Sequence, residues 1–548
     1  MASNTLQKGT SRDRSAFVHK VARSITEVQA NVNNVADVLV FLEVLGYSDK
    51  TAFENGYSDL RELARKVYDY IDFFENIPGG GEELKSPFLA PVSSVKRRLL
   101  ESLGFAFPGL ATLGLLYTFG FSLWLTWLLP LPVVTANAIG VFFGALITEG
   151  HMQTYGRTLM FAYNQGNTSE SRRVLKKSYY ALGAVLATCL VLLYGLSGVL
   201  GVPQQLFLIA ALATAGTAVP RVCFMALYAV RRIGQVVLCY SLGFASLLLV
   251  YFATAPMIPD TTIRYIASLS VTSVLLAATG AHYSRRVLVQ REAAAGGNLP
   301  HFFRSISVSR KTIRPRFSVQ FWETQPYFLF GTFFFAMLFG DRILSWAFNP
   351  LRGFDGVSLP LLFNPAYHIG ADLAMFILFP VGLLQYVIIT PIFEQLSNLS
   401  LELRVTEVHS VDRAMRKRYA VLQLASLGLA GAVAFALITL GPTLAPTLVG
   451  SAVSVGILRI GAISNVFLSL YLSNILFMMV FNRPRWLAIT AILGVVILGG
   501  SGLIFAQLGF EKIVYAYLLA SVSVATLSFL AVRNFLKRPA SLFFSRFV

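Results

Sequence analysis

The stretch YFLFGTFFFAMLFGDRILSWAF, residues 327–348, combines a long run of apolar and aromatic side chains with one adjacent charged pair. The run is long enough to cross a membrane as a helix, which takes about 20 residues. The charged pair is Asp341 and Arg342, and charges at membrane depth are costly and usually functional. Neighbours in sequence lie on different sides of a helix, so we expect each charge to find its partner on another segment.

The composition is typical of a membrane protein. The 548 residues are 55% hydrophobic and 13% charged, and the mean hydropathy is +0.64, whereas soluble domains carry about 25% charged residues. The net charge of +18 arises outside the first 100 residues, which hold 13 basic and 13 acidic side chains. This excess falls mostly in short loops, where it sets insertion orientation, so we expect no nucleic-acid partner.

Apolar windows of about 20 residues recur after Leu103 and predict about twelve spanning helices. The predicted spans are residues 103–129, 132–155, 178–200, 205–229, 233–254, 263–284, 326–348, 367–392, 419–440, 454–481, 485–509 and 513–535. Alternate connections are rich in Lys and Arg, which is the pattern of cytoplasmic loops. We therefore predict an all-α polytopic membrane protein with an even number of spans and both termini in the cytoplasm.

The longest internal connection, residues 285–321, divides the spans into six and six. It is basic and contains Gly296, Gly297 and Pro300, so it is predicted to be a cytoplasmic linker. It is either a plain solvated loop or one that includes an interfacial helix. The predicted domains are a cytoplasmic helical region (1–100), a first six-helix bundle (101–284), this linker, and a second six-helix bundle (322–548).

Residues 1–100 are expected to form a cytoplasmic helical hairpin. The first helix is predicted from apolar residues at alternating spacings of three and four: Val18, Val21, Ile25, Val28, Val32, Val35, Leu39 and Leu42. The second is predicted to begin at a cap, Asp59, and to place Leu60, Leu63, Val67, Ile71 and Phe74 on one face. A hairpin this small needs a surface to pack on, either its own membrane domain, a second copy, or a partner enzyme.

Charges within the spans are the candidate functional residues. At 1.5 Å per residue, Asp341, Arg342, Asp372 and Arg459 all lie in the outer third of the second bundle. We predict that the two aspartates pair with the two arginines across helices, either as a packing network or as a gate or lining of a substrate path. Weaker candidates, for a cytoplasmic vestibule, are Glu149, His151, Arg157, Glu323 and Glu394.

Sequence motifs of enzymes are absent. The chain has no His-Glu-x-x-His motif, no Gly-x4-Gly-Lys-Ser/Thr phosphate loop and no Gly-x-Ser-x-Gly motif. Its three cysteines, Cys189, Cys223 and Cys239, lack metal-ligand spacing. We therefore expect no enzymatic activity, no cofactor and no metal site.

Two neighbouring segments carry a family resemblance. Phe339-Gly-Asp341-Arg342, followed by Tyr367-His-Ile-Gly370-Ala-Asp372-Leu-Ala, resembles the Pel-type exopolysaccharide exporters of the multidrug, oligosaccharidyl-lipid and polysaccharide flippase superfamily. The resemblance implies two six-helix bundles around a central cavity in a bacterial cytoplasmic (inner) membrane. It also implies a sugar polymer that crosses after synthesis by a cytoplasmic glycosyltransferase, and it carries over Asp341, Arg342, Gly370 and Asp372 as characteristic residues.

Three functions follow as hypotheses. The first is export of an exopolysaccharide, with membrane lipid, a glycosyltransferase and other synthase subunits as partners. The second is a lipid-linked oligosaccharide flippase or a cation-coupled small-molecule exporter of the same superfamily. The third is a membrane scaffold that anchors a polysaccharide synthase and moves nothing. For export, the energy comes either from an ion gradient, with Asp341 or Asp372 as carrier, or from polymerisation itself.

Overall fold

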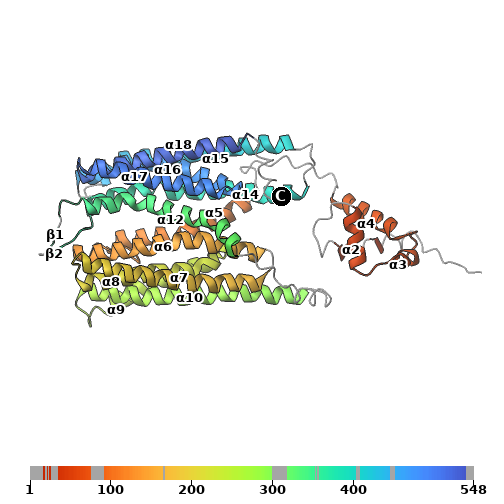
Figure 1. Ribbon diagram of the computed structural model, residues 1–548, viewed down its shortest axis with the longest axis horizontal. Coiled ribbons are helices and arrows are strands. Elements are labelled where there is room, and N and C mark those ends of the chain that lie inside the picture. Colours follow the sequence, from red (N-terminus) through yellow and green to blue (C-terminus); the bar gives the residue numbers. More distant parts are fainter. Residues whose placement is uncertain are drawn as a thin grey trace, which may run out of the picture. The chain divides into compact units, whose positions relative to one another are not determined.

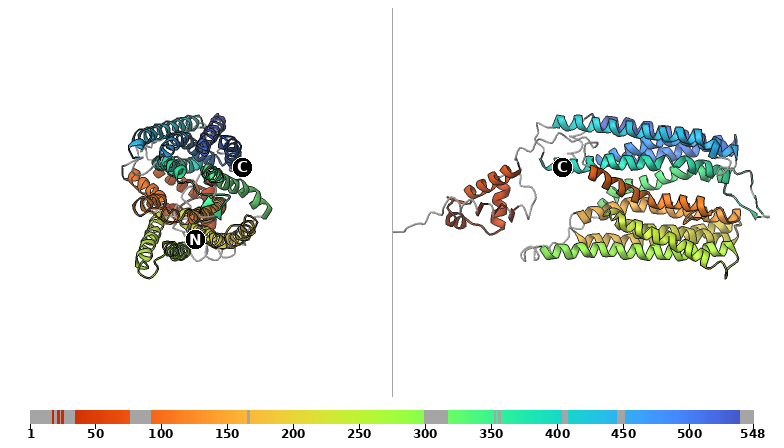
Figure 2. Two further views of the ribbon diagram at one scale, coloured as in Figure 1. Left: turned by 90° about the vertical axis from the view of Figure 1, so that its left-hand side faces the viewer. Right: turned by 180° about the vertical axis from the view of Figure 1, so that it is seen from behind.

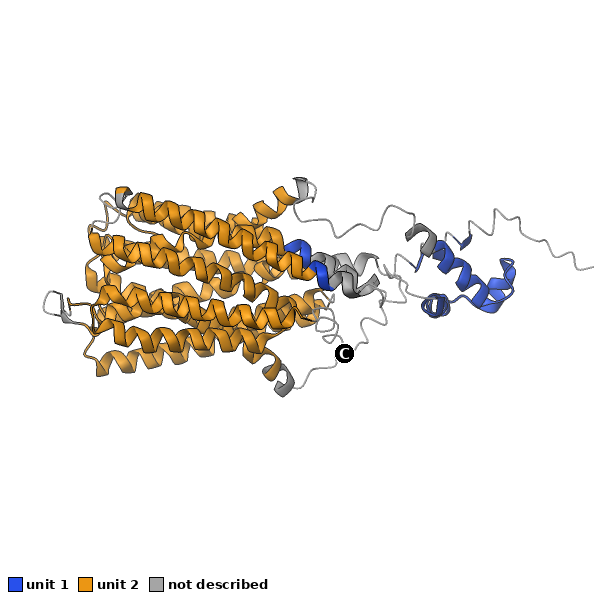
Figure 3. Cartoon of the chain, turned by 90° about the horizontal axis from the view of Figure 1, so that it is seen from above, with its two compact units in different colours: residues 1–91, 390–414 blue, residues 92–389, 415–548 orange. Residues whose placement is uncertain are grey.

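The computed structural model describes most of the chain and divides it into two compact units. The described residues are 17–18, 21–22, 24–25, 35–75, 92–164, 167–298, 317–351, 353–354, 357–402, 408–444 and 451–537. One unit comprises Met1–Pro91 with Thr390–Ala414, and the other comprises Val92–Ile389 with Met415–Val548 (Figure 3). We refer to the second as the membrane unit.

The N-terminal residues form a small helical core. Its described helices include α2 (Val35–Val44), α3 (Asp49–Glu54) and α4 (Leu60–Glu75), so a short helix that was not predicted, α3, lies before α4. Val38, Leu42, Leu63 and Val67 are fully buried in this core. The predicted cap of α4 is confirmed, since Asp59 Oδ1 accepts a hydrogen bond of 2.6 Å from the Glu62 amide. Two positions of the predicted first stripe, Val28 and Val32, lie outside the described residues.

The membrane unit contains the spanning helices. Among the described residues, twelve helical segments are long and apolar enough to cross a membrane, as predicted, and the chain is a multi-pass membrane protein. The helices are α5 (Val92–Phe119), α6 (Leu131–Asn164), α7 (Thr168–Val199), α8 (Gln204–Ala229), α9 (Ile233–Ala253), α10 (Thr261–Asn298), α12 (Phe317–Ala347), α13 (Pro365–Met375), α14 (Leu378–Glu402), α15 (Val408–Leu444), α16 (Ala452–Val480), α17 (Pro484–Ala506) and α18 (Ile513–Phe535). Helices α13 and α14 together make one span.

The helices of the membrane unit form two bundles. Helices α5 to α10 pack together in one, and α12 to α18 pack together in the other (Figures 1 and 2). One end of the unit carries the short antiparallel strands β1 (Gly353–Phe354) and β2 (Val357–Ser358), and we call it the β end. The opposite end, where α10 ends and α12 begins, is called the linker end.

Helices α6 and α12 bring the two bundles together. They approach closely at Gly150 and Gly331, because neither residue has a side chain to hold the backbones apart. A Cβ atom at Gly150 would lie 2.6 Å from the Phe328 carbonyl oxygen, and one at Gly331 would lie 2.9 Å from the Glu149 carbonyl oxygen. The two bundles therefore have a backbone contact at this crossing.

The first span ends ten residues earlier than predicted. Helix α5 stops at Phe119 because Gly120 has a φ of +75°, in the left-handed region that glycine favours. The following loop satisfies its own backbone, since the Trp127 amide donates to the Gly120 carbonyl over 2.7 Å. Apolar residues 120–129 had extended the predicted helix, but they fold back into the first bundle.

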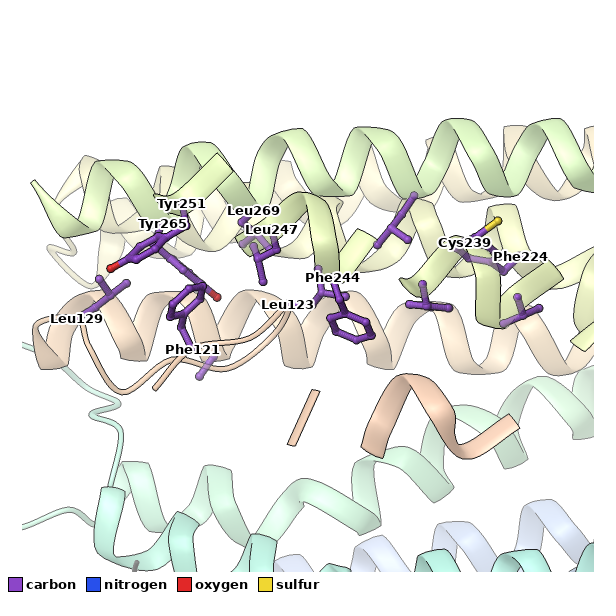
Figure 4. Packing of buried hydrophobic residues seen from close by; sticks show 14 of the residues in the cluster. Phe121, Leu123, Leu129, Phe224, Cys239, Phe244, Leu247, Tyr251, Tyr265 and Leu269 are labelled. Carbon is purple, nitrogen blue, oxygen red and sulfur yellow. The ribbon is translucent and has the colours of Figure 1, made fainter. Parts of the chain in front are cut away.

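The packing of that loop fixes the β end of the first bundle. The ring of Phe121 lies 4.3 Å from that of Tyr251, and Tyr265 donates a hydrogen bond of 3.1 Å to the Ser122 carbonyl (Figure 4). The same buried cluster includes Trp346 and Phe363 from the second bundle. Apolar side chains of both bundles thus belong to one core, which the second bundle joins at the β end.

The eighth span is interrupted just before Pro380. Pro380 lacks an amide hydrogen, and its ring conflicts with the carbonyl of the residue four positions earlier, Phe376. Helix α13 ends at Met375 and α14 begins at Leu378, so the break falls at this point. Asn364 caps the start of α13 by accepting a hydrogen bond from the Tyr367 amide over 3.2 Å. The short helix α13 therefore has defined ends.

The basic connection is partly helical. Helix α10 continues to Asn298, through Arg285, Arg286 and Arg291, so the first part of the segment assigned to the linker extends the sixth span. Helix α12 begins at Phe317, inside the same segment. The rest of the predicted linker, residues 299–316, lies outside the described residues.

Candidate functional site

A cavity of about 830 Å³ lies between the two bundles. It is lined by α5, α6, α8 and α9 of the first bundle and by α12, α13 and α16 of the second. Its walls are largely apolar and include eight Phe, Trp and Tyr residues: Phe105, Trp124, Phe142, Tyr228, Tyr240, Phe335, Phe339 and Trp346. Pockets for small organic molecules have this size and this mixture of apolar walls and few polar groups.

The predicted charges meet toward the β end of this cavity. Arg342 donates to Asp372 Oδ1 from Nε over 2.9 Å and from Nη2 over 2.8 Å. Its Nη1 donates to Asp341 Oδ1 over 3.1 Å. The expectation that adjacent residues do not pair is therefore wrong here, because the long arginine side chain turns its guanidinium back beside its own helix, where Nη1 also reaches the Leu338 carbonyl.

The two aspartates have different surroundings. Asp341 and Arg342 have side chains only 1% and 2% exposed, whereas the Asp372 side chain is 21% exposed and lines the cavity. The second oxygen of Asp341 accepts a hydrogen bond from the Tyr367 hydroxyl over 3.0 Å. Buried charges are stable only when paired and hydrogen-bonded, and these contacts meet that need. Asp341 is thus an internal member of the network and Asp372 its cavity-facing member.

Arg459 does not join the network. Its side chain is exposed, while the preceding Ile457 and Leu458 are 1% exposed and face the interior. Depth along a helix does not determine which side a residue faces, since each residue turns the direction by about 100°. The expected pairing of an aspartate with Arg459 is therefore not formed, and Arg342 serves both acids.

His368 belongs to the same group and was missed in the sequence. Its Nδ1 lies 3.4 Å from Asp372 Oδ2, and its ring stacks on Phe363, at 4.2 Å, and on Trp346, at 5.4 Å. The available signal was the spacing of four residues from Asp372, which places both side chains on one face of a helix. The quoted motif contained this histidine, but no role was assigned to it.

A second ion pair lines the cavity farther toward the linker end. Glu149 on α6 bonds Arg221 on α8 over 2.5 Å, and Gln153 donates to the other glutamate oxygen over 3.2 Å. Glu149 was a predicted vestibule residue, but its partner was missed. The signal for Arg221 was a single cation well inside an otherwise apolar span.

Arg157 connects the two bundles near the linker end. Its guanidinium lies 4.2 Å from the ring centre of Tyr327, on α12, and donates to Asn482 Oδ1 over 3.2 Å. The Tyr327 hydroxyl donates to the same Asn482 oxygen over 2.7 Å. One residue of the first bundle is thus held by two of the second.

The remaining vestibule candidates lie elsewhere. His151 is 5% exposed, packs against Tyr155 and does not line the cavity. Glu323 is exposed near the start of α12, and the side chain of Glu394, on α14, lies outside what the structure describes. Within the described residues, no three His, Cys, Asp or Glu side chains are grouped so that they could hold a metal ion.

Solved structures share this arrangement of bundles. The chain matches a crystal structure of MATE in the bent conformation with a TM-score of 0.56 and 13% identity, over 84% of this chain and 98% of that one. The Vibrio cholerae MATE transporter VcmN in the bent form matches with a TM-score of 0.53 and 14% identity, over 82% and 99%. The protein has the MATE fold. A third MATE structure, an outward-facing multidrug resistance transporter of the MOP superfamily, has a TM-score of 0.53 at 14% identity, over 83% and 98%.

The MATE fold accounts for the membrane unit as a whole. The similar structures are transporters, and nearly their full length is matched. No known family model and no curated protein matches the sequence. At 13% to 14% identity the comparison establishes the fold, while cargo and direction must be argued from the cavity.

Proposed function

We propose that this protein exports a sugar polymer across a bacterial cytoplasmic membrane through the cavity between its bundles. Three observations support the proposal. The fold is that of MATE transporters, the segments around Asp341 and Asp372 resemble Pel-type exporters, and the bundles enclose a cavity. A cytoplasmic glycosyltransferase would supply the polymer.

The observation that carries the proposal is the chemistry of the cavity wall. Sugar rings present apolar C–H faces and hydroxyl edges, so they need aromatic surfaces with a few polar groups between them. The cavity offers both, with aromatic residues such as Trp124, Phe335 and Trp346 beside the polar groups of Glu149 and Asp372. A cavity of about 830 Å³ holds a short segment of a chain at one time, which suits a polymer that passes in steps.

The pairing of the cavity charges favours a neutral cargo over a cationic one. Each carboxylate that lines the cavity has an arginine partner, Glu149 with Arg221 and Asp372 with Arg342. A cationic drug would need to displace one of these arginines, because like charges are repelled and a desolvated cation needs a free anion. Hydroxyl groups can hydrogen-bond to paired charges without separating them.

In the proposed orientation the linker end faces the cytoplasm. Basic residues gather in or next to the connections of that end, including Arg231, Arg232 and Arg483 in connections and Arg416 and Lys417 near the start of α15, as the positive-inside rule requires. The β end, where Trp346 and Phe363 of the second bundle join the apolar core of the first, is then the outer end. In this proposal the polymer enters at the linker end and leaves at the β end, and movement of the two bundles opens each end in turn.

Secretion of polysaccharide by living cells tests the proposal. A strain that lacks the protein is compared with the same strain carrying it on a plasmid, and extracellular and cell-associated polysaccharide are both measured. We expect extracellular polymer to be lost and then restored. Efflux of a cationic dye is measured in parallel. Unchanged secretion together with lost dye efflux would refute polymer export and favour a small-molecule exporter.

A further inference from the structure

Two buried nitrogen atoms beside the cavity lack hydrogen-bond partners. They are Nε1 of Trp346 and Nε2 of His368. The two residues are 4% and 6% exposed, so bulk water does not surround them. Buried polar atoms in proteins are almost always hydrogen-bonded, and an unpaired one costs about 1–3 kcal/mol. Both residues line the cavity, so a small rotation of either ring would let its nitrogen bond a molecule held there.

The two residues belong to one site. Their rings are stacked at 5.4 Å with an angle of 20° between planes, and both residues line the cavity together with Asp372 and Trp124. Arg342 binds Asp372 through Oδ1, whereas Oδ2 faces His368 Nδ1 over a longer distance of 3.4 Å. The Oδ2 atom can accept a further hydrogen bond, since a carboxylate oxygen has two lone pairs.

We propose that Trp346, His368 and Asp372 form a subsite for a neutral sugar ring at the β end of the cavity. This inference rests on the proposed function and names where the polymer is held. The indole nitrogen is only a donor and the carboxylate is only an acceptor, so the ligand must both accept and donate. Hydroxyl groups on adjacent ring carbons do both.

The same groups disfavour charged ligands. An anion would meet Asp372, and a cation would meet Arg342, which also lines the cavity. The broad faces of Trp124 and Phe339 line the same cavity and can cover the apolar face of a sugar ring. Donor, acceptor and aromatic surface together match a neutral, hydroxyl-rich ring.

Binding of neutral oligosaccharides to the purified full chain tests the subsite. Maltohexaose and chitohexaose are titrated by calorimetry into the protein in detergent. Trp346→Phe keeps an aromatic ring but removes the N–H group together with part of the indole, and His368→Phe keeps an aromatic ring without either imidazole nitrogen. The loss of one hydrogen bond should weaken binding of the better sugar by roughly three- to tenfold. Trp486→Phe is the matched control, because Trp486 lies on α17, is 43% exposed and does not line the cavity.

Each outcome decides the matter. Weaker binding in Trp346→Phe and His368→Phe with unchanged binding in Trp486→Phe supports the subsite. Equal binding in all variants overturns it, as does failure of the wild-type protein to bind either sugar, which would mean that water alone satisfies the two nitrogens. Secretion separates this result from the proposed function. Lost secretion in the deletion strain with unaltered binding in Trp346→Phe overturns only the subsite, and the reverse pattern overturns only polymer export.

Discussion

Arg342 on α12 donates two hydrogen bonds to a single oxygen of Asp372 on α13, over 2.9 and 2.8 Å, while its third nitrogen binds Asp341. One cation thus pairs with two acids from consecutive spans. The arrangement fixes α13 beside α12 at the β end of the cavity. It also predicts that the three residues will not respond alike to substitution.

Replacing Arg342 is expected to be the most damaging change in the network. Arg342→Gln leaves two aspartates, one of them 1% exposed, without a counter-charge, and breaking a buried pair costs about 3–5 kcal/mol. Thermal unfolding in detergent should show a strongly lowered midpoint. Arg459→Gln is the control, because that side chain is exposed and should change the midpoint little. A midpoint in Arg342→Gln equal to that of the control would contradict the assigned role.

Substituting each aspartate in turn should distinguish a role in packing from a role in transport. Asp341→Asn removes an internal acid that binds the Tyr367 hydroxyl, so secretion should fall only as far as the amount of protein in the membrane falls. Asp372→Asn changes a cavity-facing acid and should reduce secretion several-fold at a normal protein level. Both quantities are measured in the same strains. If secretion per protein molecule fell equally in both variants, the division between internal and cavity-facing acid would be wrong.

The effects of substituting Glu149 and Arg221 on secretion should not be additive, because the two residues form an ion pair. Each single change, Glu149→Gln or Arg221→Gln, leaves one charge unpaired in the cavity wall, and we expect reduced secretion. The double variant removes both charges and should recover part of the loss, because no unpaired charge remains. Secretion is compared among the four proteins in a double-mutant cycle. Strictly additive losses would show that the two residues act separately.

The crossing of α6 and α12 should not tolerate a methyl group. In Gly331→Ala the added Cβ meets the Glu149 carbonyl at 2.9 Å, and a backbone atom cannot move aside cheaply. We expect a loss of about 1–3 kcal/mol in stability, measured by thermal unfolding, and lower secretion. Gly183→Ala is the matched control, since a Cβ there meets nothing within 4 Å and alanine favours a helix. Equal stability of the two variants would argue against a tight crossing.

Hydropathy was sufficient to predict the twelve spans, because the length of an apolar helix is set by the thickness of the membrane. It was not sufficient for the loop after Phe119, where apolar residues pack inside the protein and one glycine conformation ends the helix. Apolar residues alone do not reveal whether they face lipid or fold into a core.

The sequence predicted how deep in the membrane the candidate residues lie, but not which side of its helix each residue faces. Asp341, Arg342 and Asp372 were placed together correctly, since rise per residue gives depth. Arg459 was predicted to pair with an aspartate, but its side chain is exposed, and Arg221 was overlooked. Helices buried on several sides have no clear polar face from which to infer the direction of a side chain. His368 acquires its partners only when α13 folds against Trp346 and Phe363.

The break between α13 and α14 affects how far a movement of Asp372 can spread along the eighth span. Asp372 lies on a helix of 11 residues whose hydrogen-bond ladder ends at Met375, ahead of Pro380. A tilt of α13 therefore need not be transmitted along α14. Movements at Asp372 can therefore be confined to α13, because the break divides the eighth span into two helices and the shorter one carries Asp372.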